Sequence, residues 1–324
     1  PIGYVLHGTN YGYEIQKILG QGTFGITYLA KVKMEGSLGS LDSHVFVAIK
    51  EFFMKEINGR NGTSVTSGSK GGVFYDYRKK FKKEAENLSK LNHPNIVKVM
   101  ESFETNNTIY YVMEYFSGGS LEQKLGNEGI PIKEAIDYTN QIGSAIAYMH
   151  EHKMLHLDLK PGNIVLDDKG NAVLIDFGLS KQYDENGQPE SSTTVGGGTP
   201  GYAPLEQANY RDGKDFPVTM DIYALGATMF KMLTGTRAPE ASAILNDGFP
   251  TYMLLSVCDS KFIVACIERA MSPKKKDRYQ TVKELLSDVA KCSISQSSKN
   301  KETVCEVPVI NDGGDWGYYK TIEG

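Results

Sequence analysis

Residues 156–178 read HLDLKPGNIVLDDKGNAVLIDFG, and four polar side chains in this stretch are of types that could do chemistry. Asp158 and Asp176 supply carboxylates, Asn163 supplies an amide and Lys160 supplies an ammonium group. Oxygen atoms of carboxylates and amides are the ligands that Mg²⁺ prefers, and an ammonium group can neutralise a phosphate. Short apolar runs separate these residues, which indicates that buried strands hold them in place.

Two interpretations of this stretch remain open when it is taken alone. Residues 163–166 and 172–175 predict a β-hairpin that turns at DDKGN, and the polar residues could simply cap and solvate that hairpin. Alternatively, the hairpin is a rigid frame that presents carboxylates and an amide to a metal–phosphate substrate. Other parts of the chain are needed to choose between them.

The glycine-rich segment LGQGTFGITYLA is a second candidate, because Gly20, Gly22 and Gly25 form the pattern GxGxxG. Glycine lacks a Cβ, so backbone amides can approach a phosphate closely. On its own the pattern favours a plain glycine-rich turn. Strand-like residues flank it, however, whereas a dinucleotide-binding fold would need a helix directly after the glycines. The context therefore indicates a loop folded over a nucleotide.

Two charged residues on apolar segments have both a structural and a functional interpretation. Lys50, in VFVAIKEFF, either points to water or faces a cleft, where a phosphate and Glu84 could neutralise it. Glu84 by itself is best explained as a solvated residue of the helical stretch FKKEAENLSKL. Asp221 lies among apolar residues, and a buried carboxylate is costly unless it is hydrogen-bonded. We expect Asp221 to tether the backbone of a neighbouring loop.

A mostly β N-terminal part is expected to position the glycines and Lys50. Strands are predicted at 12–32, 45–53, about 96–104 and about 108–115. Residues 33–44 are interpreted as a hairpin excursion. Residues 54–76 are turn-rich without a helical period and are interpreted as a long loop. A helix is expected near 77–91, with an apolar face formed by Phe81, Ala85, Leu88 and Leu91.

A mostly α part follows Gly119. Helices are predicted at 132–151, 219–234, about 259–271 and 280–291. The second of these is apolar nearly all round, which is typical of a buried central helix. Residues 293–324 are polar and lack periodicity, so a mobile tail is expected there.

Composition excludes several classes of protein. Of 324 residues, 40% are hydrophobic and 23% are charged, as in ordinary globular proteins. The net charge of −4 gives no electrostatic case for binding nucleic acid or an anionic membrane. The four cysteines form no CxxC pair, which favours free thiols and a cytoplasmic location. No apolar run approaches the roughly 18–20 residues of a membrane span, and no signal peptide is recognised.

Seven segments occur in one order along the chain: GQGTFG, VAIK, LNHPNIVKV, HLDLKPGN, DFG, GTPGYAPLE and DIYALG. With these segments the chain resembles the eukaryotic-like (Hanks-type) serine/threonine protein kinases over about residues 12–291. GITYLA, AIKEFF and GYAPLEQ are most similar to the bacterial branch. The resemblance implies an α+β fold of two lobes, a small mostly β N-lobe at about 12–115 and a larger mostly α C-lobe at about 119–291.

The resemblance also implies an activity, the transfer of a phosphoryl group from Mg-bound ATP to serine or threonine hydroxyls of protein substrates. Asp158 would orient the acceptor hydroxyl, and Lys160 would neutralise charge on the transferred group. The hydroxyl of Thr199 could bond both of them and fix their geometry. Asn163 and Asp176 would bind Mg²⁺.

For the nucleotide, the resemblance implies a site formed by the glycine-rich loop, a lysine–glutamate pair and backbone groups that bind adenine. Lys50, positioned by Glu84, would hold the α- and β-phosphates. The residues implied for the nucleotide site are Leu19, Gly20, Gly22, Gly25, Thr27, Ala48, Lys50, Glu84, Met113, Glu114, Phe116 and Val165. The family's stacked apolar spine corresponds to Leu88, Val99, His156 and Phe177, and Glu206 is expected to pair with Arg278.

Some residues depart from the family pattern. Leu157 stands where most regulated members have arginine, so we expect activity to depend little on loop phosphorylation. Thr27 replaces the usual apolar residue over the adenine. Autophosphorylation, if present, is expected at residues 191–194. Two alternatives remain, a pseudokinase-type nucleotide-binding scaffold and a small-molecule phosphotransferase of related fold. Oligomeric state is not predicted.

Overall fold

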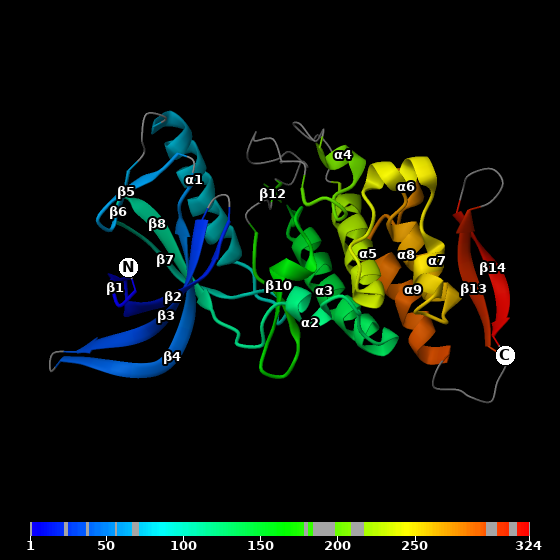
Figure 1. The fold of residues 1–324 in the computed structure, drawn as a ribbon, viewed down its shortest axis with the longest axis horizontal. Coiled ribbons are helices and arrows are strands. Elements are labelled where there is room, and N and C mark those ends of the chain that lie inside the picture. Colours follow the sequence, from blue (N-terminus) through cyan, green and yellow to red (C-terminus); the bar gives the residue numbers. More distant parts are fainter. Residues whose placement is uncertain are drawn as a thin grey trace. The chain divides into compact units, whose positions relative to one another are not determined.

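The computed structural model describes residues 2–22, 25–36, 39–55, 57–66, 71–177, 181–183, 198–208, 217–295, 303–310 and 316–323 (Figure 1). The chain divides into two compact units, Pro1–Ser117 and Gly118–Gly324. Most of the strands belong to the first unit, and all but one of the α-helices in the described residues belong to the second. The expected α+β class is confirmed.

The first unit is built on one antiparallel sheet with the strand order β1-β2-β3-β4-β8-β7. Its strands are β1 (Val5–His7), β2 (Gly12–Gln21), β3 (Gly25–Gly36), β4 (Gly39–Phe52), β7 (Val99–Thr105) and β8 (Thr108–Glu114). The hairpin excursion expected at residues 33–44 is confirmed, because β3 and β4 stay paired through it as far as Gly36 opposite Gly39. The two strands are therefore longer than the sequence pattern indicated.

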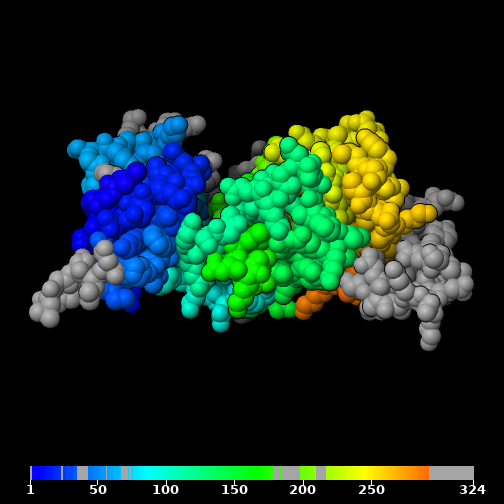
Figure 2. Space-filling model, turned by 60° about the horizontal axis from the view of Figure 1, so that its bottom comes forward, coloured from blue at the N-terminus to red at the C-terminus, as the bar shows by residue number. Residues whose placement is uncertain are grey.

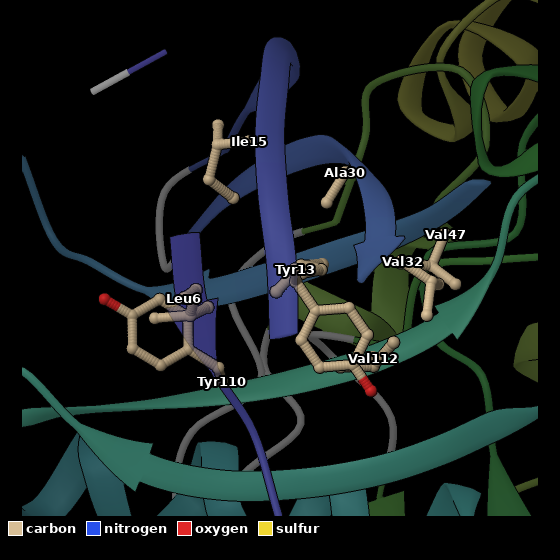
Figure 3. Close-up of a cluster of buried hydrophobic side chains, with 9 residues drawn as sticks. Leu6, Tyr13, Ile15, Ala30, Val32, Val47, Tyr110 and Val112 are labelled. Carbon is tan, nitrogen blue, oxygen red and sulfur yellow. The ribbon is translucent and has the colours of Figure 1, made fainter. Parts of the chain in front are cut away.

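Alternation along these strands divides the apolar side chains between two faces of the sheet. One face carries a buried cluster to which β1, β2, β3, β4 and β8 all contribute (Figure 3). The cluster consists of Leu6, Tyr13, Ile15, Ala30, Val32, Val47, Ile49, Tyr110 and Val112. The neighbouring positions on β4 and β8, which include Lys50 and Tyr111, belong to the opposite face.

Helix α1 (Gly71–Leu88) packs against β7 and β8. The expected apolar face is confirmed, because Phe81, Ala85 and Leu88 are all buried. The helix begins six residues before the predicted start. Phe74, in these extra turns, is fully buried, and its ring lies 5.5 Å from the ring of Phe52 on β4. This tertiary contact anchors turns that have no strong local helical signal.

The expected long loop at 54–76 is wrong in part, because it contains a short hairpin, β5 (Gly59–Asn61) with β6 (Ser64–Thr66), as well as the start of α1. Gly62 turns the hairpin with a φ of 62°, which suits glycine. The Val65 amide donates to the Asn106 carbonyl, and the Asn107 side chain donates to the Val65 carbonyl. The hairpin is thus held by the turn between β7 and β8, a distant partner that a local pattern does not reveal.

The second unit is mainly helical. Its helices are α2 (Leu121–Leu125), α3 (Ile132–Glu151), α4 (Leu205–Ala208), α5 (Thr219–Thr234), α6 (Ala241–Asp247), α7 (Thr251–Leu255), α8 (Lys261–Ala270) and α9 (Val282–Ser295). Helix α3 packs against α5 and α9, and α5 packs against α8. On the face shown in Figure 2, the chain around α2 and α3 (green) and the chain around α6 and α7 (yellow) form much of the surface.

The predicted central helix is confirmed: α5 covers residues 219–234, and every residue from Thr219 to Leu233 is buried. Gly226 allows α5 to approach α8 closely, because a Cβ at this position would lie 2.8 Å from the Cβ of Ala270. Helix α5 ends at Gly235, which adopts the left-handed conformation at the C-cap. The well-packed helix supplies a rigid base for the loops that precede β10.

The predicted hairpin at 163–175 is confirmed as β10 (Ile164–Leu166) paired with β11 (Ala172–Leu174). Asp167 accepts the backbone amides of Lys169 and Asn171, and Gly170 has a φ of 82°. Both features are typical of a tight turn. A second small ladder pairs β9 (Met154–Leu155) with β12 (Lys181–Gln182).

Residues 293–324, expected to form a mobile tail, include regular secondary structure, and their mobility stays a prediction. Helix α9 extends to Ser295, and β13 (Thr303–Ile310) pairs with β14 (Trp316–Glu323) as an antiparallel hairpin. Strand β13 lies against α8 (Figure 1). The two stretches are TVCEVPVI and WGYYKTIE, and their β-branched and aromatic residues favour strands.

Candidate active site

Three side chains in the second unit are joined in a closed triangle of hydrogen bonds. Lys160 Nζ donates to Asp158 Oδ2 at 2.8 Å and to Thr199 Oγ1 at 2.7 Å, and Thr199 Oγ1 donates to Asp158 Oδ1 at 2.7 Å. The sequence-based expectation that Thr199 bonds both residues is therefore confirmed. The triangle fixes both oxygen atoms of the carboxylate in one orientation.

Asn163 extends this triangle toward the hairpin. It ends a 3₁₀ turn (Pro161–Asn163), and its Nδ2 donates to the backbone oxygen of Asp158 at 2.8 Å and to Asp158 Oδ2 at 3.0 Å. The Ile175 amide donates to the Asn163 carbonyl at 3.1 Å, which ties the residue before Asp176 to Asn163. The hairpin thus brings together the chain at the two positions expected to bind Mg²⁺.

Asp221 tethers the loop that carries Asp158. It is fully buried and accepts the backbone amides of His156 at 2.9 Å and Leu157 at 2.8 Å, while His150 Nε2 lies 2.9 Å from Oδ2. Burial by itself would raise the pKa of Asp221, but the hydrogen bonds from the His150 side chain and the His156 backbone amide hold it below its ordinary value. The interpretation of Asp221 as a backbone tether is confirmed, and His150 is a partner that sequence reasoning missed.

His156 is a buried neutral residue of the same loop. Its Nδ1 accepts the Asp158 amide at 3.3 Å, and its ring lies 5.1 Å from the ring of Phe177. Burial lowers the pKa of His156, because the charged imidazolium would lose its hydration. The contact between His156 and Phe177 is the one expected within the second unit for the apolar spine; Leu88 and Val99 are buried in the first unit.

In the first unit, Lys50 on β4 pairs with Glu84 on α1. Lys50 Nζ lies 3.2 Å from Glu84 Oε1, and each side chain is only 11% exposed. Lys50 is therefore a buried ammonium paired with Glu84 and does not point to water, whereas its contact with a phosphate remains a prediction. The β4 register places Lys50 opposite Thr27 of β3, next to the glycine-rich turn.

The glycine-rich turn joins β2 to β3, and the Gly22 amide donates to the Gly25 carbonyl at 2.9 Å. A Cβ at Gly25 would lie 2.7 Å from the Glu51 carbonyl oxygen, so a larger residue would displace the backbone. Among the described residues, no heavy atom lies within 4 Å of a Cβ built at Gly20 or Gly22. Packing among the described residues therefore does not explain glycine at these two positions.

The other expected nucleotide-binding residues are spread over both units. Ala48 lies opposite Met113, and Val47 lies opposite Glu114, in the β4–β8 ladder. Leu19 is 40% exposed on β2, and Phe116 lies two residues beyond β8. Val165 belongs to β10 in the second unit, where it bridges Ser120. A nucleotide site that combines these residues remains a prediction.

The profile of the family described as "Protein kinase domain" matches residues 13–296. The chain belongs to the protein kinase family. Among known proteins it is 32% identical over 220 residues to the "Probable serine/threonine-protein kinase PknB" of Lactococcus lactis, covering 65% of this chain and 34% of that protein. It is 31% identical over 224 residues to the "Serine/threonine-protein kinase PrkC" of Bacillus subtilis, covering 69% of this chain and 30% of that protein. The similarity to the bacterial branch is confirmed.

A solved structure described as "PpkA-294 apo form" matches with a TM-score of 0.69 and 25% sequence identity, covering 89% of this chain and 98% of that chain. The expected fold is therefore confirmed as that of a protein kinase. The chain spans only 30–46% of the length of the curated protein kinases it resembles.

In this protein kinase domain, Arg278 is fully buried and forms a bidentate ion pair with Glu206. Its Nη1 and Nη2 lie 2.5 Å and 3.1 Å from the two carboxylate oxygens, and Nη1 also donates to the Thr219 carbonyl. The predicted pair is confirmed. Arg278 thereby joins α4, which follows the GTPGYAP segment, to the start of α5.

Leu157 departs from the family pattern, and its surroundings are apolar. It is 3% exposed and packs in a cluster with Leu155, Tyr183 and Met220. Its φ is 64°, a conformation that costs a non-glycine residue about 1–3 kcal/mol. The Leu157 amide donates to Asp221, and the Leu157 carbonyl accepts a hydrogen bond from Gln207 Nε2 at 2.6 Å. Gln207, buried on α4, is a further residue that sequence reasoning missed.

Some expectations fall outside what the structure describes. The proposed autophosphorylation sites at 191–194 and residues 23–24 of the glycine-rich turn are not among the described residues. Within the described ranges, no group of three or more His, Cys, Asp and Glu side chains is arranged to hold a metal ion. No helix among the described residues has the length and hydropathy needed to cross a membrane.

Proposed function

We propose that this chain catalyses phosphoryl transfer from Mg-bound ATP to serine or threonine hydroxyls of protein substrates. The observation that carries the proposal is the closed triangle of Asp158, Lys160 and Thr199. Phosphoryl transfer needs little covalent chemistry from the protein and depends on positioning and charge stabilisation. A fixed carboxylate beside an ammonium group supplies both.

Each residue of the triangle has a separate role in this proposal. Asp158 accepts a hydrogen bond from the acceptor hydroxyl and aims its oxygen. Lys160 neutralises charge that builds up on the transferred group. Thr199 holds both side chains in place, because its hydroxyl accepts a hydrogen bond from Lys160 and donates one to Asp158.

The donor set fits Mg²⁺. The Asn163 side chain donates both of its hydrogen bonds to Asp158 through Nδ2. Its Oδ1 is a hard oxygen atom of the kind that Mg²⁺ prefers. Asp176, two residues beyond β11, supplies a carboxylate. Asn163 and Asp176 would hold the Mg²⁺, which would supply positive charge to neutralise the phosphates. Lys50, held by Glu84, would bind the α- and β-phosphates of ATP.

The test is a transfer assay with labelled ATP and Mg²⁺, in which protein substrates and a panel of small molecules are offered to the purified chain. We expect label on serine or threonine of protein. Asp158→Asn should lower turnover by about 10²–10⁴-fold, the usual contribution of a positioned acid–base group, while ATP binding stays nearly unchanged.

Other outcomes would favour the alternatives. Nucleotide binding without transfer by the wild-type chain would indicate a scaffold, and label only on small molecules would indicate a different phosphotransferase. Turnover of Asp158→Asn within a few-fold of wild type would contradict the role of Asp158.

For the location of the protein we propose the cytoplasm, because the four cysteines form no CxxC pair and two of them, Cys258 and Cys266, are buried. A cysteine content of this kind is typical of proteins in reducing compartments. Cell fractionation followed by immunoblotting tests this, and recovery in an extracellular fraction would contradict it.

A further inference from the structure

Tyr111 on β8 lies directly opposite Lys50 on β4 in the antiparallel ladder. Directly opposite residues point to the same face of a sheet and can interact. Tyr111 is fully buried, and helix α1 packs against β8. The register therefore puts a tyrosine, with one hydroxyl and one aromatic face, beside the Lys50–Glu84 ion pair.

Tyr111 contacts both members of that pair. Its hydroxyl donates to Glu84 Oε1 at 3.0 Å, and the same oxygen atom lies 3.2 Å from Lys50 Nζ. Lys50 Nζ also lies 5.7 Å from the centroid of the Tyr111 ring and 5.9 Å from that of Phe81, within the range in which a cation is attracted to an aromatic face. The rings of Tyr111 and Phe81 are 5.1 Å apart.

These contacts limit two side chains that are flexible by nature. Lysine and glutamate side chains each rotate about several bonds. If a single hydrogen bond joins them, such rotations can still move the ammonium group. A second donor to the same oxygen, fixed by a rigid ring, restricts the carboxylate. The ring face in turn restricts the ammonium.

We propose that Tyr111 is a positioning residue that fixes Lys50 and Glu84 in the geometry needed to bind the phosphates of ATP. The inference rests on the proposed function, in which Lys50 contacts phosphate and Tyr111 does not. It assigns Tyr111 a role that the glycine-rich turn, the lysine–glutamate pair and the metal ligands do not include.

The neighbouring residue supplies a matched control. Tyr110 lies opposite Glu51, and its hydroxyl donates to Glu51 Oε1 at 2.7 Å on the other face of the sheet. Tyr110 is 4% exposed, so it too has a buried hydroxyl that donates to a carboxylate. Tyr110→Phe and Tyr111→Phe therefore delete the same atom from the same strand, but only the second touches the Lys50–Glu84 pair.

The first experiment compares kcat/KM for ATP and urea-unfolding midpoints of the two variants. Both midpoints should fall, because each variant loses a hydrogen bond to a buried carboxylate. For Tyr111→Phe, kcat/KM should fall about tenfold, as expected when one hydrogen bond to a charged group is lost. For Tyr110→Phe it should stay within about threefold, since a purely structural loss leaves the folded enzyme competent.

A double-mutant cycle with Glu84→Gln tests whether Tyr111 acts through Glu84 or only stabilises the first unit as a whole. Binding of Mg·ATP is measured by titration calorimetry for the wild type, both single variants and the double variant. Tyr111→Phe should weaken binding in the wild-type background and have little further effect after Glu84→Gln, because residues that act through one contact are not additive. The same cycle with Tyr110→Phe should be additive.

Three results would overturn the inference. Equal losses of kcat/KM in the two tyrosine variants would show that Tyr111 has only a structural role. Additive effects of Tyr111→Phe and Glu84→Gln would show that Tyr111 does not act through Glu84. If the wild type neither binds Mg·ATP nor transfers phosphate, the proposed function fails and this inference fails with it; the first two results leave the proposed function intact.

Discussion

The carboxylate of Asp221 accepts the backbone amide of Leu157 at 2.8 Å, although 64 residues separate the two along the chain. Leu157 adopts the left-handed conformation, with a φ of 64°, and directly precedes Asp158. The buried helix α5 thus determines the backbone geometry of the loop that carries the proposed catalytic carboxylate.

Asp221→Asn should lower the free energy of unfolding by about 3 kcal/mol, because a buried charge that accepts several hydrogen bonds is replaced by a neutral amide. Turnover should fall as well, since the amides of His156 and Leu157 lose their anchor. Urea unfolding and a transfer assay measure the two effects. A stability loss below about 1 kcal/mol would show that the tether contributes little.

Asp176→Ala should weaken Mg-dependent nucleotide binding as well as turnover, because the variant removes a proposed metal ligand. Calorimetric titration of ATP with and without Mg²⁺ measures this directly. Asp167→Ala, in the β10–β11 turn, is the control: it removes a carboxylate of the same hairpin and should leave the Mg²⁺ effect intact. If Mg²⁺ does not tighten ATP binding to the wild type, the proposed metal site is wrong.

Activity should depend little on phosphorylation of the loop before GTPGY. In protein kinases with arginine at the position of Leu157, a loop phosphate can neutralise that charge and order the loop. Leu157 has no charge, and its neighbours Leu155, Tyr183 and Met220 form an apolar cluster. Phosphatase-treated enzyme and the double variant Thr193→Ala/Thr194→Ala should keep kcat/KM within about tenfold of untreated enzyme. A larger drop in both would reveal another basic residue that binds the phosphate.

Stability should fall as the pH drops below about 6.5, the ordinary pKa of histidine. Burial lowers the pKa of His156, so the folded state keeps this ring neutral while the unfolded chain takes up a proton. The stabilising contribution is therefore present above that pH and lost below it, with a slope of up to about 1.4 kcal/mol per pH unit for each proton. His156→Phe should show a shallower slope between pH 7.5 and 5.5 in urea unfolding. Identical slopes would exclude His156 as the cause.

Arg60→Ala should destabilise the first unit by about 2–3 kcal/mol, because Glu51 would lose the guanidinium partner of a buried charge. Glu51 is 1% exposed. Its carboxylate pairs with Arg60 Nη2 and accepts hydrogen bonds from the hydroxyls of Tyr28 and Tyr110. Lys82→Ala, which breaks an exposed pair with Glu104, should produce no resolvable change in the unfolding midpoint. Equal effects of the two substitutions would contradict the importance of the buried carboxylate.

Much of the candidate site followed from the sequence because its residues lie in short segments with strong local signals. Asp167 and Gly170 determine a tight turn, so the β10–β11 frame that brings Asn163 near Asp176 could be predicted directly. The apolar period of α3 and the continuous apolar surface of α5 likewise determined both helices to the residue. The roles of Lys50 and Asp158 followed from the order of motifs that resemble one family.

Tertiary structure alone decided which distant partners complete these segments. The sequence places two adjacent tyrosines on one strand, but only the β4–β8 register makes Tyr111 the partner of Glu84 and Tyr110 the partner of Glu51. Packing against Phe52 extends α1 to Gly71, and the bonds to Asp221 and Gln207 hold Leu157 in its unfavourable conformation. Local patterns report the spacing of side chains along one element, whereas these choices depend on hydrogen bonds and contacts between residues 22 to 64 positions apart.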